Sequence, residues 1–83
     1  MARLYFHLFD SVGFVPDEEG KEVPDAEAAR NTAVAAIRSI VAEEVRHGRV
    51  DLRGRIEITS STNQVLAVVH FTDAVELFSH SSK

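Results

Sequence analysis

Residues Asp25–His47 read DAEAARNTAVAAIRSIVAEEVRH, and this stretch decides the fold of the chain. Alanine, the strongest helix former, is frequent in it, and apolar residues recur at helical spacing. Pro24 and Asp25 make a favourable start, because the Asp25 carboxylate can accept hydrogen bonds from the first helical N–H groups. Gly48 follows as a typical helix stop. The stretch therefore predicts one long amphipathic helix.

The predicted helix carries two adjacent apolar stripes. The first would lie against a sheet and consists of Ala26, Ala29, Ala33, Ala36, Ile37 and Ile40. The second consists of Val34, Val41 and Val45. Together they are wider than one small sheet needs, so either loop residues such as Val50 and Leu52 cover the second stripe or another chain does.

Strand patterns flank the helix on both sides. Leu4–Phe9 alternates bulky, β-prone residues on two faces, which is typical of an inner strand. Asp10–Asp17 is predicted to be a loop, and a short polar edge strand should end near Val23. After the helix, Arg55–Thr59 alternates in polarity. Val65–Phe71 is nearly all apolar, which predicts a second inner strand.

These elements predict an α+β fold in the order ββαββ, with a four-stranded, mainly antiparallel sheet and one long helix packed on one face. A polar turn at Ser60–Asn63 should join the last two strands as a hairpin. Thr72–Glu76 would begin a short helical turn. We expect a single domain over residues 1–78 and a frayed tail at 79–83.

Length and composition restrict the function. The chain has 83 residues and no cysteine, so its core is small and has no disulfides, which makes oligomerisation a reasonable source of stability. The lack of cysteine fits a reducing compartment, and we expect a cytoplasmic protein. The net charge of −4 argues against a nucleic-acid partner. No apolar run approaches the ~20 residues that span a bilayer, so no membrane partner is expected.

One helix covers one face of a small sheet, which leaves the other face open. If Leu4, Phe6 and Leu8 lie under the helix, the open face carries the candidate interface residues Tyr5, His7, Phe9, Leu66, Val68 and His70. An exposed apolar patch of that size is unusual on a monomer. A homodimer that buries this face is favoured over coverage by Leu77 and Phe78, and a ligand or another protein is the remaining alternative.

Two histidines are the foremost candidates for chemistry. His7 and His70 would share the open face on neighbouring strands, where Glu57, Asp10 or His80 would supply a third metal ligand. Their spacing fits no short metal motif. Structural histidines satisfied by hydrogen bonds are therefore favoured, and no metal or cofactor is predicted.

The other polar clusters are predicted to be surface features. Asp10 and Asp17–Glu19 lack the spacing of a calcium loop. The hydroxyl-rich segments Ser60–Asn63 and Ser79–Ser82 lack a nucleophile elbow and a matched base. Arginines at positions 46, 49, 53 and 55 form one local basic cluster, which nearby carboxylates offset. No catalytic residue is predicted, and we do not expect an enzyme.

A recurrent pattern runs through residues 4–76. It comprises Tyr5–Leu8, Asp10, Asp17–Gly20, Glu22, Pro24, Asp25, Ala28, Ala29, Gly48, Leu52, Gly54–Ile58 and Phe71–Val75. In this pattern the chain resembles a family of small bacterial domains, found mostly in alphaproteobacteria, that is labelled a domain of unknown function. The resemblance implies no activity.

Leu4–Val45 is also similar in outline to antitoxins of the HicB type, which begin with a hairpin, an acidic turn with glycine and proline, and an alanine-rich helix. Their DNA-binding segment does not follow here, so this similarity implies partner binding and not repression. The sequence thus predicts a non-catalytic interaction module that forms a homodimer. The alternatives are a HicB-like antitoxin or partner-binding protein, and a small metal or ligand binder that uses His7 and His70.

Overall fold

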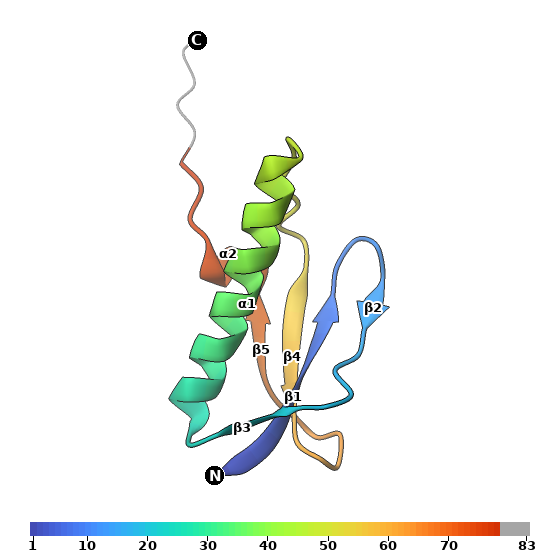
Figure 1. Ribbon diagram of the computed structural model, residues 1–83, viewed down its shortest axis with the longest axis vertical. Coiled ribbons are helices and arrows are strands. Elements are labelled where there is room, and N and C mark those ends of the chain that lie inside the picture. The colour runs from blue at the N-terminus through green and yellow to red at the C-terminus, as the bar shows by residue number, and fades with distance from the viewer. Residues whose placement is uncertain (79–83) are drawn as a thin grey trace.

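A computed structural model describes residues 1–78 of the chain (Figure 1). The elements follow in the order β1 (Ala2–Phe9), β2 (Phe14–Val15), β3 (Lys21–Val23), α1 (Ala26–Arg46), β4 (Arg55–Thr59), β5 (Val65–His70) and α2 (Phe71–Ala74). The predicted α+β class, with one long helix packed on one face of an antiparallel sheet, is confirmed. The tail expected at 79–83 lies outside the described residues.

The sheet has five strands, one more than predicted. Its order is β2-β1-β4-β5, all neighbours are antiparallel, and β3 also pairs with β1. The extra strand is β2, which lies in the predicted loop and pairs with the end of β1 through Leu8↔Val15 and Phe9↔Phe14. β1 therefore pairs with the two short strands β2 and β3 along one side and with β4 along the other.

The predicted inner position is confirmed for β1 and wrong for the segment Val65–Phe71. The second inner strand is β4, and β5 lies at the edge of the sheet (Figure 1). The helix-facing side chains of β4, Ile56 and Ile58, are 3% and 1% exposed, whereas Val65 and Leu66 of β5 are each 51% exposed. The hairpin after β4 places β5 beside it, and no further strand of the described chain pairs beyond β5. The apolar sequence of β5 therefore does not lead to burial of this strand.

Both predicted ends of the long helix are confirmed. The Asp25 carboxylate accepts a hydrogen bond from the Ala28 N–H at 2.8 Å. At the other end, Gly48 adopts φ +86° and donates to the Val45 carbonyl at 2.9 Å, while the Arg49 N–H donates to the Glu44 carbonyl at 3.2 Å. This pair of bonds is a Schellman motif, which favours glycine because the left-handed conformation strains other residues.

The buried face of α1 follows a single ridge. Its members are spaced four residues apart and are Ala29, Ala33, Ile37 and Val41. The predicted burial is wrong for Ala26 and Ala36, which are exposed, and Val41 belongs to the core and not to a spare stripe. Residues four apart form one ridge on a helix, and this ridge is the buried part of α1, while Ala28, Val34 and Ile40 pack against the core beside it and stay partly buried. Val45 is 57% exposed, while Leu52 packs against the core as expected.

The end of the described chain packs on the helix side. In α2, Phe71 and Ala74 are buried, and the Arg38 guanidinium donates to the Ala74 carbonyl at 2.8 Å. Leu77 and Phe78 are 65% and 88% exposed, so the alternative in which they cover the open sheet face is wrong. Among residues 1–78, no helix combines the length and the apolar character needed to cross a bilayer.

Candidate functional site

The strand register places three rows of side chains on the sheet face that α1 does not cover, here called the open face. Across β1, β4 and β5 the rows are Phe9–Arg55–His70, His7–Glu57–Val68 and Tyr5–Thr59–Val65. The central strand β4 thus contributes a polar stripe to a face that is otherwise aromatic and aliphatic. The alternation within β4 predicts this polar stripe. Its position in the middle of the open face follows only from the strand order, which puts β4 between β1 and β5.

Aromatic rings line the β1 side of the open face. Phe14 of β2 stacks on Phe9 with ring centroids 4.6 Å apart and lies 5.9 Å from the His7 ring. Tyr5 stacks parallel to His7 at 6.5 Å. The Arg55 guanidinium lies 4.2 Å from the centre of the Phe9 ring and pairs with Glu57 at 3.0 Å. Through these contacts the side chains on the β1 side partly cover one another.

His7 is engaged on both ring nitrogens. Its Nδ1 accepts a hydrogen bond from the backbone N–H of Asp17 at 3.0 Å, so this nitrogen carries no proton. Its Nε2 lies 3.1 Å from the hydroxyl of the buried Thr59 and donates to it. The prediction of a structural histidine satisfied by hydrogen bonds is confirmed for His7.

The Asp17 carboxylate closes a gap along the edge of β1. It accepts hydrogen bonds from the N–H groups of Phe6 at 3.0 Å, Gly20 at 3.1 Å and Glu19 at 3.2 Å. Burial works to raise the pKa of Asp17, but these three donors and the nearby His7 outweigh it, so the pKa lies below its ordinary value. Between β2 and β3, where neither strand pairs with β1, Asp17 thus supplies the hydrogen bond that a neighbouring strand would otherwise make to β1.

The candidate interface residues divide into two groups. Tyr5, His7 and Phe9 are half-buried by their own chain, whereas Leu66 and Val68 are 51% and 37% exposed and His70 is exposed as well. Two further exposed apolar side chains were missed, Phe14 at 54% and Val65 at 51%. The sequence predicts a loop at Phe14, and only its pairing with Phe9 places it on this face.

A joint metal site for His7 and His70 finds no support in the geometry. The two histidines lie on β1 and β5 with β4 between them, so the predicted neighbouring strands are wrong. Glu57 is paired with Arg55, and Asp10 caps the β1–β2 turn. Within residues 1–78, no three potential ligands gather as a metal would need, and His80 lies outside this range.

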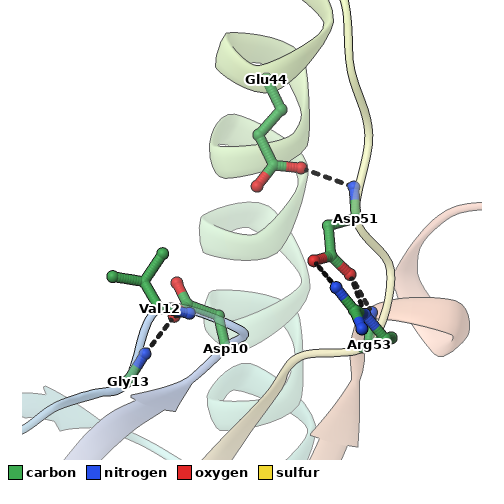
Figure 2. Close-up of polar contacts among 6 residues, drawn as sticks. All are labelled: Asp10, Val12, Gly13, Glu44, Asp51 and Arg53. Atoms are coloured by element: carbon green, nitrogen blue, oxygen red, sulfur yellow. Dashed lines mark hydrogen bonds and ion pairs between the residues drawn. The ribbon is translucent and has the colours of Figure 1, made fainter.

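A second polar region joins the end of α1 to the loop before β4. Figure 2 shows the Glu44 carboxylate accepting from the Asp51 N–H at 3.0 Å, and the Asp51 carboxylate holding Arg53. Two N–H groups of Arg53 donate to Asp51, at 2.9 and 2.7 Å. Arg53 and the Ser11 hydroxyl hold the pKa of Asp51 well below its usual range.

An open cavity of about 380 Å³ lies between this loop, the helix end and the β1–β2 turn. Its carboxylates Glu44 and Asp51 are already committed to contacts within the chain. Three of the four arginines in the basic cluster are paired in the same way, since Arg46, Arg53 and Arg55 lie beside Glu43, Asp51 and Glu57. The polar groups of this region are therefore largely occupied by contacts within the chain.

Comparison with known proteins places the chain in a family. A family model described as Domain of unknown function (DUF6894) matches residues 3–72. The match covers most of the 83 residues, so the chain belongs to this family. Comparison with curated proteins and with solved structures gave no match.

Proposed function

We propose that this member of the family is a non-catalytic bacterial interaction module that works in the cytoplasm as a homodimer, with the open face as its contact surface. One observation carries the proposal: Val65, Val68 and Phe14 expose apolar side chains on a face that no element of residues 1–78 covers, and Leu66, at a register shift of β5, is 51% exposed beside them. Apolar surface of this kind is typical of a contact with another protein.

A binding role also agrees with the state of the half-buried polar groups. Both nitrogens of His7 are engaged within the chain, and Asp17 is held by three backbone donors. These groups are structural, and the exposed side chains beside them are aliphatic or aromatic. A chain of 83 residues without disulfides also gains stability when a second copy buries part of its surface.

Sedimentation velocity over a concentration series tests the proposal. The wild-type protein should be a dimer at tens of micromolar, and Val68→Asp should convert it to a monomer because a buried unpaired charge is costly. Val45→Asp is the matched control, since Val45 is 57% exposed on α1, away from the open face. A wild-type monomer at these concentrations, or dissociation by Val45→Asp alone, would overturn the proposed interface.

The second candidate is a HicB-like partner-binding protein. It is supported by the order of elements, in which β1 pairs with β2 and β3 around an acidic turn and the alanine-rich α1 follows. Genomic context tests it directly, because a toxin gene should lie beside the gene for this chain. Co-expression with that neighbour should then yield a stable complex, and the lack of a toxin gene would end this alternative.

A further inference from the structure

The two edges of the sheet differ in how well they are protected. Along β1, the strand β2 is only two residues long, the short strand β3 carries Lys21 and Glu22, and the Asp17 carboxylate accepts from the Phe6 N–H. Charges and side-chain caps of this kind discourage pairing with another chain. β5 reads VLAVVH and contains no charged residue, no proline and no glycine. The β5 edge is therefore the open end of the sheet (Figure 1).

Exposure along β5 is continuous and is not confined to one face. Val65, Leu66, Ala67 and Val68 are all exposed, although their side chains do not share one direction. Ala67 pairs with Ile58, a core residue that is 1% exposed, so Ala67 lies on the helix side and still remains uncovered. The first part of β5 is thus open on both faces, which a contact with the open face alone would not explain.

The ladder between β4 and β5 shows which main-chain groups of β5 point outward. The Phe71 N–H donates to the Gly54 carbonyl at 3.0 Å, and hydrogen-bonded pairs alternate with non-bonded pairs in an antiparallel ladder. Ile56↔Val69 is therefore the next bonded pair, and Glu57↔Val68 is a non-bonded one. It follows that the N–H and C=O of Val68 point away from β4, toward the edge.

The outward edge of β5 is capped at its C-terminal end. The His70 N–H, which points outward in the same way as that of Val68, donates to the Asp73 carboxylate of α2 at 2.9 Å. No such side-chain partner meets the Val68 N–H among residues 1–78. The stretch that is free to pair therefore has Val68 near its centre and stops at His70.

We propose that β5 pairs antiparallel with β5 of a second copy, around a two-fold axis at Val68. Each Val68 N–H donates to the Val68 carbonyl of the other copy, and on both sides of the axis Ala67 lies opposite Val69 and Leu66 lies opposite His70, with no carboxylate, lysine or arginine in the contact. A second copy fits because the segment has no charge to repel itself and supplies both the donor and the acceptor. The inference rests on the proposed self-association and narrows its contact surface to the β5 edge, where Val65 and Val68 border the open face.

Amide hydrogen exchange on the wild-type protein tests the pairing without any substitution. The Val68 amide should exchange about tenfold or more slowly above the dimer dissociation constant than below it. The Val69 amide, which faces β4, should be protected at both concentrations. A dimer whose Val68 amide exchanges fast would overturn the edge pairing and leave the proposed homodimer standing, whereas a monomer at all concentrations would overturn both.

Val68→Pro and Val68→Thr form a matched pair for the same test. Proline removes the outward N–H and takes no bond from the β4 ladder, and such a proline is tolerated on an edge strand. It should raise the dimer dissociation constant by about tenfold to a hundredfold, while threonine keeps the N–H and should change it far less. Phe14→Ser alters the opposite border of the open face. If Phe14→Ser weakens the dimer as much as Val68→Pro does, the copies stack face to face and the edge pairing is wrong.

Discussion

The backbone N–H of Asp17 donates to Nδ1 of His7 over 3.0 Å, and this bond ties the β2–β3 connection to the inner strand β1. The Asp17 carboxylate completes the tie by accepting from the Phe6 N–H on the same strand. The Asp17 side chain therefore stabilises the edge of the sheet between β2 and β3, where neither strand pairs with β1. The acidic loop that contains Asp17 therefore has a structural role, because Asp17 connects it to β1 through two hydrogen bonds.

Replacing Asp17 with alanine should destabilise the fold. Three backbone N–H groups, of Phe6, Glu19 and Gly20, lose their acceptor, and we expect the free energy of unfolding to fall by about 1–3 kcal/mol. Urea denaturation monitored by circular dichroism measures the loss. Glu18→Ala, an exposed neighbour in the same turn, is the control and should change stability by less than about 0.5 kcal/mol. Equal effects of the two substitutions would contradict the role of Asp17.

The lowered pKa of Asp17 predicts a loss of stability in acid. The unfolded state binds a proton at higher pH than the folded state does, so the stabilisation is fully present above the ordinary aspartate pKa of about 4 and is lost as the pH falls below it. Urea midpoints between neutral pH and pH 3 should decrease accordingly. Asp17→Asn should flatten part of this decrease, and Asp51, whose pKa is also lowered, accounts for a further part. An unchanged acid slope in Asp17→Asn would contradict the assignment.

The tautomer of His7 is predicted by its neighbours. Because Nδ1 accepts from the Asp17 N–H, the neutral ring should carry its proton on Nε2. His47 is an internal control with the opposite expectation, since its Nδ1 lies 3.0 Å from the Glu43 carbonyl and must donate to it. Long-range ¹H–¹⁵N correlation spectra distinguish the two tautomers. A proton on Nδ1 of His7 would contradict the geometry.

Gly20→Ala and Gly48→Ala should separate backbone strain from steric conflict. Both glycines have a positive φ, +73° and +86°, so alanine is strained at either position. A Cβ at Gly20 would also lie 2.8 Å from Cε2 of Tyr5 and 3.0 Å from the Leu4 carbonyl oxygen, whereas a Cβ at Gly48 meets nothing within 4 Å. Thermal unfolding should show that Gly20→Ala costs at least about 1 kcal/mol more than Gly48→Ala. Equal costs would mean that the chain near Gly20 moves aside.

The long helix could be predicted from the sequence to within its caps. Its signals are local: the Asp25 carboxylate accepts from the N–H of Ala28, three residues away, and Gly48 adopts a positive φ that residues other than glycine disfavour. The alternation in Leu4–Phe9 likewise predicted an inner strand with two faces, because side chains of a strand point alternately to opposite sides. Half of the candidate site, Tyr5, His7 and Phe9, followed from this alternation.

The tertiary structure alone decided which strand is central and which is the edge. Val65–His70 is apolar enough for an inner strand, and β4 is polar on one face, yet the hairpin and the lack of a further pairing partner among residues 1–78 put β5 outermost. Strand order depends on contacts between segments far apart in the sequence, which local patterns do not encode. The same holds for Phe14 on the open face, for the bond between His7 and Asp17, and for the outward N–H of Val68, because each depends on register between strands.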